Sequence, residues 1–223
     1  MRLSFASFFI TIVLFAVSCD NVENLLNGTE DGKITAKEKL DDVLRTARTD
    51  FSADAMLAAI YGREVNTNGE IDLLQTNSFN AFVYIMQSDV QQSNEFYVPV
   101  FGAGPVKSPV NFNTMLSFVK NATAKNIMSA VFGTLSTSSI DPAANYSDSP
   151  EVLELLFRRN DVNNFRTINP TSRIDMFLVP SKSIDSISIV NSADWIVNFY
   201  GDNTSLVLWI NSASGEVKNI AEL

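Results

Sequence analysis

The sequence predicts an α+β protein of two similar units, each an antiparallel sheet with helices on one face, after an N-terminal signal peptide. Three observations predict this fold. Apolar residues recur at helical spacing in several segments, which indicates amphipathic helices. Short apolar runs between turn residues indicate strands. Helix-like and strand-like runs follow one another in blocks in both halves of the chain, which is typical of the α+β class.

Composition divides the chain into five segments. We expect a signal peptide over 1–18, a polar tether over 19–36, a first α+β unit over 37–110, a helical connection and loop over 111–148, and a second α+β unit over 149–223. The tether is polar and contains two glycines, so it is expected to hold the folded region away from whatever the N-terminus is attached to.

Local signals of the first unit place one helix and three strands. Thr35 and Glu38 have the spacing of a capping box, so we expect a helix to begin near Thr35. Strands are expected over 55–65, 81–86 and 96–101, with a helix as the alternative for residues 55–60. Pro99 has no amide to donate, which places the third strand at a sheet edge or at a bulge.

The second half repeats this pattern. Apolar spacing predicts a helix within 111–135, and Ser149-Pro150-Glu151 predicts a helix start with Ser149 as the N-cap. Strands are expected over residues 174–179, 195–200 and 206–210. The last of these has no polar residue, so we expect a central strand that is covered on both faces.

The N-terminus has the anatomy of a secretory signal peptide. Arg2 is followed by a short apolar stretch and by small residues before Cys19, the only cysteine of the chain. Ala16-Val17-Ser18-Cys19 resembles the lipobox of bacterial lipoproteins, although Ala16 stands where leucine is usual. This resemblance implies a lipid on Cys19 and attachment to the cell envelope, at the periplasmic face or at the outer membrane or cell surface of a bacterium.

Two other readings of this segment stay open. An ordinary signal peptide would be cleaved and would leave the cysteine without a role. A membrane-spanning anchor is disfavoured, because the apolar run is shorter than the ~20 residues that a spanning helix needs. Three hydroxyl residues, Ser4, Ser7 and Thr11, also interrupt the run.

The two halves resemble each other in the order of their elements. Residues 77–85 align with 191–199, and 97–106 align with 208–217. A duplicated unit explains this order, and chance similarity between two hairpins is the other explanation. The closing segment 205–219, with its glycine two residues before a valine, resembles the end of PepSY-like domains. That resemblance implies a secreted or membrane-attached bacterial protein that binds or inhibits other envelope proteins, and it supplies no catalytic residues.

Composition excludes several functions. The chain contains no histidine, so Ser-His-Asp and Cys-His catalysis lack their base, and the usual zinc and iron sites lack a common ligand. The net charge of −9 opposes binding to nucleic acid and to anionic lipid headgroups. We therefore expect no nucleic acid partner, and contact with the membrane only through the N-terminal lipid.

Residues 27–38 resemble an EF-hand calcium loop, in which oxygen ligands surround the ion and a glycine makes the sharp turn. The expected ligands are Asn27, Thr29, Asp31, the backbone carbonyl of Lys33 and Glu38. Asparagine replaces the usual aspartate at the first position, which removes one charge. A polar tether that leads into a capped helix is the alternative.

These observations lead to an expected function. We expect a lipid-anchored envelope lipoprotein that is not an enzyme and that binds another envelope protein or a small ligand. Calcium is the one candidate cofactor, through the loop 27–38, and a calcium-binding lipoprotein is the first alternative. A hydrolase that uses two carboxylates is the second alternative, although no spacing in the sequence selects a pair.

Overall fold

The computed structural model describes residues 32–74, 80–90, 96–101, 109, 119, 121–135, 139–140, 144, 146–181, 193–212 and 214–220. The predicted signal peptide and Cys19 lie outside the described residues, as do Asn27, Thr29 and Asp31 of the predicted calcium loop. No helix within the described part of the chain is both long and apolar enough to span a membrane.

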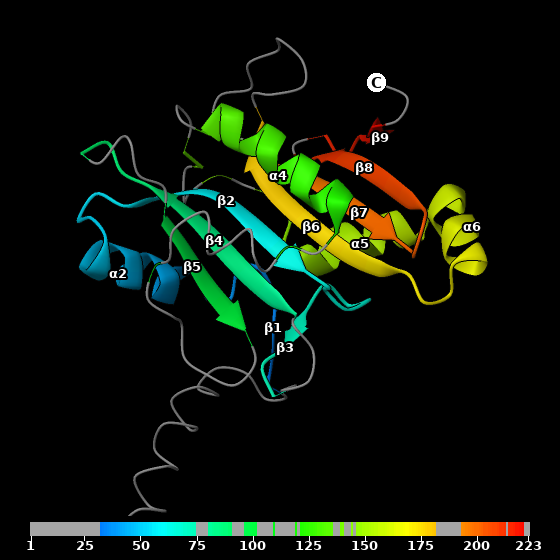
Figure 1. The fold of residues 1–223 in the computed structure, drawn as a ribbon, viewed down its shortest axis with the longest axis horizontal. Helices are drawn as coiled ribbons and strands as arrows, with labels where there is room; N and C mark the ends of the chain where they lie inside the picture. The colour runs from blue at the N-terminus through cyan, green and yellow to red at the C-terminus, as the bar shows by residue number, and fades with distance from the viewer. Residues whose placement is uncertain are drawn as a thin grey trace, which may run out of the picture.

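Seven of the described strands form a single antiparallel sheet (Figure 1). Its strands, in spatial order, are β5 (Phe96–Phe101), β4 (Ala81–Gln87), β2 (Met56–Arg63), β6 (Arg173–Pro180), β7 (Ala193–Tyr200), β8 (Ser205–Asn211) and β9 (Val217–Asn219). A separate ribbon pairs β1 (Lys33–Ile34) with β3 (Ile71–Asp72). The predicted α+β class is confirmed, but the two expected sheets are one continuous sheet.

The described helices cover both faces of the sheet. They are α2 (Leu40–Asp50), α4 (Ala122–Leu135), α5 (Ser149–Phe157) and α6 (Asn160–Ile168). Helices α2, α5 and α6 pack into the core of one face, whereas α4 packs into the core of the other (Figure 1). The expectation of helices on one face is therefore wrong, because β2 and β7 bury nearly every residue and need cover on both sides.

The two halves of the sheet meet between β2 and β6. The first half contributes β2, β4 and β5 to the sheet after α2, and the second contributes β6, β7 and β8 after α6, with the short β9 as a fourth strand. The first strands of the halves pair antiparallel through three residue pairs, which include Tyr61 with Phe177. The centre of the sheet therefore depends on pairing between residues more than a hundred positions apart.

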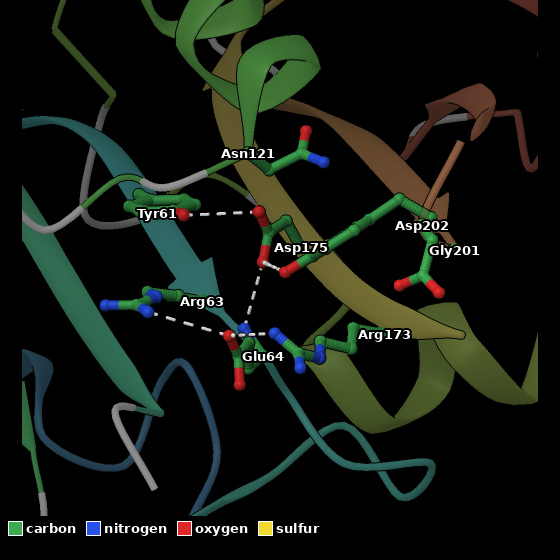
Figure 2. Close-up of a pocket in the computed structure, with 9 residues that line it drawn as sticks. Tyr61, Arg63, Glu64, Asn121, Arg173, Asp175, Gly201 and Asp202 are labelled. Carbon is green, nitrogen blue, oxygen red and sulfur yellow. Dashed lines mark hydrogen bonds and ion pairs between the residues drawn. The ribbon is translucent and has the colours of Figure 1, made fainter. Parts of the chain in front are cut away.

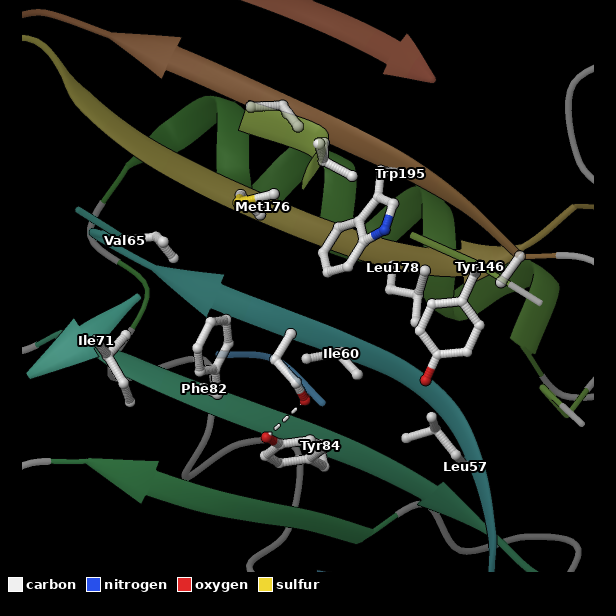
Figure 3. Close-up of a cluster of buried hydrophobic side chains, with 14 of the residues drawn as sticks. Leu57, Ile60, Val65, Ile71, Phe82, Tyr84, Tyr146, Met176, Leu178 and Trp195 are labelled. Carbon is white, nitrogen blue, oxygen red and sulfur yellow. Dashed lines mark hydrogen bonds between the residues drawn. The ribbon is translucent and has the colours of Figure 1, made fainter. Parts of the chain in front are cut away.

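The larger core lies on the face of α2, α5 and α6 (Figure 3). Trp195 is fully buried there, and its indole N–H donates to the backbone oxygen of Ser147 at 2.8 Å. The Tyr84 hydroxyl, also fully buried, donates to the backbone oxygen of Ala36 at 2.9 Å. The polar ends of both aromatic side chains thus have hydrogen-bond partners inside the core, so their burial leaves no polar group unsatisfied.

The helix starts differ from the sequence predictions. The Glu38 carboxylate does accept the Thr35 amide at 2.8 Å, but α2 begins only at Leu40. The amide of Ala36 is instead bound by the Ser149 hydroxyl at 3.1 Å, so the chain turns toward α5 before the helix begins. The N-cap of α5 is Asp148 rather than Ser149, and it forms a capping box with Glu151.

The predicted strands are mostly confirmed. Residues 56–63 form a strand rather than a helix, and β5, which contains Pro99, lies at an edge of the sheet as expected. Strand β8 is an interior strand, because it pairs with β7 on one side and with the short strand β9 on the other. It is not fully covered on both faces as expected, because Leu206 and Val207 stay partly exposed. Helix α6 was not predicted, since its sequence is mostly polar and buries only Val162.

Candidate binding recess

A recess of about 190 Å³ opens at one end of the sheet centre, beside the residue that precedes α4 (Figure 2). Its lining comes from β2 and the residue after it, from β6, from the end of β7 and the following turn, and from the residue before α4. The lining residues are Tyr61, Arg63, Glu64, Asn121, Arg173, Asp175, Tyr200, Gly201 and Asp202. The recess therefore lies at the seam between the two halves of the sheet.

Asp175 lies at the floor of this recess and is only 1% exposed. Its Oδ1 accepts the backbone amide of Glu64 at 2.9 Å and the Tyr200 hydroxyl at 3.4 Å, and its Oδ2 accepts the Tyr61 hydroxyl at 3.2 Å. Burial raises the pKa of Asp175 to about 6, although the Glu64 amide and the Tyr61 hydroxyl act in the opposite direction. One carboxylate thus connects β2, β6 and β7.

Glu64 has an unusual backbone conformation that brings its amide to Asp175. Its φ of 47° lies in the left-handed region, which residues other than glycine rarely adopt. The amide donates to the Asp175 side chain instead of to a strand carbonyl, and the next amide, that of Val65, returns to the backbone oxygen of Ile174 at 2.9 Å. The chain therefore bulges at the edge of the recess, as is common near functional sites.

Two arginines are paired with the Glu64 side chain. Arg63 and Arg173 approach the same oxygen, Glu64 Oε1, at 3.5 and 3.1 Å. The Arg63 side chain is almost fully buried, whereas that of Arg173 is 60% exposed. In Figure 2 the two guanidinium groups lie on opposite sides of the Glu64 carboxylate. Glu64 is therefore held by two positive charges, of which only that of Arg173 is open to solvent.

The two tyrosines keep their protons over the physiological pH range. Burial raises the pKa of both Tyr61 and Tyr200 above the ordinary value of a tyrosine, and the negative charge of Asp175 acts in the same direction. The Tyr61 ring also stacks on Phe177, with the ring centroids 4.8 Å apart. Both hydroxyls are therefore fixed donors to Asp175.

Asn121 lines the recess beside α4, and a second asparagine, Asn198, is hydrogen-bonded to it. Asn121 Oδ1 accepts the amide of Ala124 at 2.8 Å and so caps the helix, and it also accepts the Asn198 side-chain amide at 3.3 Å. Asn198 lies opposite Asp175 in the pairing of β6 with β7 and is fully buried. Its Oδ1 has no hydrogen-bond partner among the described residues, an uncommon state for a buried acceptor.

The arrangement is suited to binding rather than to proton transfer. A raised carboxyl pKa beside an ion-paired carboxylate is a pattern of acid–base catalysis. Asp175 is, however, shielded from solvent, and both of its oxygens accept hydrogen bonds from the protein. The groups that can contact a ligand lie nearer the solvent: Glu64, Arg173 and Asp202 (Figure 2).

Among the described residues, no three Asp, Glu or Cys side chains come close enough together to hold a metal ion.

The structure describes only two of the residues that the sequence analysis selected. Lys33 lies in β1, where it pairs with Asp72, and the Glu38 carboxylate is hydrogen-bonded to the Thr35 amide. Since Cys19 and the other expected calcium ligands lie outside the described residues, lipidation and the calcium loop stay predictions.

None of the residues that line the recess is among the lipidation and calcium-site residues predicted from the sequence. Two signals could have found part of it, because Asp175 and Asn198 each interrupt an apolar strand. A polar residue inside such a run must find partners in the core, which makes it a candidate for a special role.

The comparisons with known proteins found no family model, no curated protein and no solved structure that matches this chain.

Proposed function

We propose that this chain is a lipid-anchored protein of the bacterial cell envelope, attached through Cys19, whose folded region is a non-enzymatic binding module that uses the recess at Asp175. The observation that carries the proposal is the set of polar groups fixed around an open recess. Asp175 is held by donors from β2 and β7, and the backbone of Glu64 adopts a rare conformation to supply one of them. Such strain is typical of functional sites.

We also infer that the two halves of the sheet descend from one duplicated unit. The inference is supported by the shared order of a helix and three antiparallel strands, in which β4 and β7 are the middle strands. An experimental structure tests it by superposition of the two halves. The duplication requires β4 to fall on β7 and α2 to fall on α6, and a superposition that misplaces the helices would remove it.

Attachment is tested in the native cell with a Cys19→Ser variant. We expect the parent protein to incorporate radiolabelled palmitate and to sediment with membranes, because the attached acyl chains partition into the bilayer. The variant should lose the label and be released into the soluble fraction. If the parent carries no palmitate label and the variant sediments with membranes as the parent does, the lipid anchor is contradicted.

Binding is tested by thermal unfolding against four sets of small probes: amines, carboxylates, sugars and neutral amides. A ligand that binds the folded state raises the melting temperature by mass action, about 2–4 °C per kcal/mol for a protein of this size. At least one set should do so. The rise should be lost in Asp202→Trp, which fills the mouth of the recess, and kept in Asp89→Trp, which alters an exposed aspartate elsewhere. A flat response to all four sets would overturn the binding role of the recess.

A further inference from the structure

We propose that the recess binds the protonated ammonium group of an organic amine about the size of one amino-acid side chain. This inference rests on the proposed binding function and names the chemical class of the ligand. The volume of about 190 Å³ lies below the ~300–1,000 Å³ of pockets for drug-sized molecules, which favours a ligand of this size.

The charges that line the recess do not balance. Arg63 and Arg173 both pair with Glu64, so both positive charges converge on a single carboxylate. The carboxylate of Asp202 is exposed and has no hydrogen bond or ion pair with any described residue, and Asp175 is bound by neutral donors only. The charge left without a direct partner is negative, which attracts a cation.

Hydrogen-bonding capacity points the same way. Asn198 Oδ1 is a buried acceptor with no partner among the described residues. Asn198 does not itself line the recess, but it pairs with Asp175 across the strands and its side-chain amide donates to Asn121, and both of these neighbours line the recess. An unsatisfied acceptor of this kind is relieved by a donor, not by another acceptor. A protonated amine brings three donors and a positive charge, whereas a carboxylate or phosphate brings only acceptors.

The N-terminus of α4 opposes the binding of a cation, but its partial positive charge is too small to cancel the negative charge that lines the recess. Helix α4 begins at the recess, and a helix N-terminus carries a partial positive charge of about half an elementary charge. The Asn121 side chain already accepts the amide of Ala124 in its first turn. Among the described residues, Asp175 and Asp202 have no arginine partner, and their two negative charges exceed the partial positive charge at the N-terminus of α4.

Isothermal titration calorimetry of the full chain tests the inference with matched probes. Nα-acetyl-lysine amide carries the ammonium group, Nα-acetyl-norleucine amide has the same alkyl chain without it, and Nα-acetyl-glutamate amide and methyl glucoside represent anions and sugars. We expect the lysine probe to bind at least ~10-fold more tightly than the norleucine probe. Asp202→Asn should weaken it about 2- to 5-fold, as is typical when an exposed ion pair is lost, and Asp89→Asn should not.

The blocked pentapeptide acetyl-Gly-Gly-Lys-Gly-Gly amide, whose only ammonium group is that of lysine, distinguishes two sources of the ammonium group. Tighter binding of the peptide than of the single amino acid would assign the site to a lysine side chain of a protein partner, and equal binding would assign it to a free amine. Both results support the cation. Binding of the glutamate or sugar probe in preference to the lysine probe would overturn the cation and leave the binding recess standing. Binding of no probe would overturn both.

Discussion

The recess and a second polar cluster on the opposite face of the sheet differ in how their polar groups are satisfied. We call that cluster the α2–α5 junction; it consists of Ala36, Lys37, Gly69, Tyr84, Asp148 and Ser149. There the Ser149 hydroxyl donates to the backbone oxygen of Gly69 at 2.6 Å, and Asp148 accepts the Lys37 amide at 3.2 Å. The junction uses its polar groups to hold the fold together, whereas the recess leaves Asp202 and Asn198 Oδ1 without described partners.

An unpartnered atom alone does not mark a site. Thr35 Oγ1, next to the junction, is also buried without a described partner, and the structure offers no reason for it. Asn198 Oδ1 differs because its neighbours Asp175 and Asn121 line an open recess in which negative charge is left without a direct partner. We therefore propose that the junction serves stability and the recess serves binding, and three comparisons of variants test that division.

The largest expected effect is that of Gly69→Ala at the junction. Gly69 has a φ of +81°, and an added Cβ would lie 2.4 Å from the backbone nitrogen of Pro150. Backbone strain and overpacking together should lower the free energy of unfolding by about 2–5 kcal/mol. Gly215→Ala is the control, because its φ is +71° and nothing lies within 4 Å of the added Cβ, so about 1–2 kcal/mol is expected. Equal losses in urea unfolding would mean that the junction contact is unimportant.

A smaller effect separates two tyrosine hydroxyls. Tyr84→Phe leaves the buried backbone oxygen of Ala36 without its 2.9 Å donor and should cost about 1–3 kcal/mol. Tyr200→Phe removes a longer bond of 3.4 Å to Asp175, which keeps two other donors, and should cost less than ~1 kcal/mol. Chemical denaturation measures both, and a larger loss for Tyr200→Phe would reverse the assignment of stability to the junction.

The smallest effect is a pH dependence that comes from Asp175. Its pKa of about 6 in the folded protein lies above the ordinary 3.8, so the folded state binds the proton more tightly than the unfolded chain does. The resulting stabilisation is complete below pH 3.8 and is lost as the pH rises through 6. From pH 7 to pH 5 the wild type should therefore gain about 1–2 kcal/mol relative to Asp175→Asn.

Denaturant unfolding of both proteins at the two pH values isolates this contribution. Asp54 has the opposite sign, because hydrogen bonds from Ser52 and Ser88 lower its pKa to about 2, but it is the same in both proteins and cancels. Parallel pH profiles for the wild type and Asp175→Asn would show that Asp175 titrates normally.

The sequence predicted local structure better than assembly. Apolar runs predicted β4, β6 and β7, and Pro99 predicted the edge strand, because each signal lies within a few residues. The single sheet depends on pairs such as Tyr61 with Phe177, which no local pattern encodes. The face that α4 covers follows from the same long-range pairing.

The recess could not be predicted from the sequence for a related reason. It combines Glu64, Asn121, Asp175 and Asp202 from separate parts of the chain, with no fixed spacing that a motif could capture. Its central hydrogen bond also needs a left-handed backbone at Glu64, a residue type that does not signal that conformation.

Mapping of backbone amide chemical shifts during titration with Nα-acetyl-lysine amide tests the division between the two regions most directly. The account predicts that the perturbed amides cluster at Glu64, Asp175, Gly201 and Asp202, which surround the recess. Perturbations centred on Ala36, Lys37 and Ser149 at the junction, with the recess amides unchanged, would contradict it.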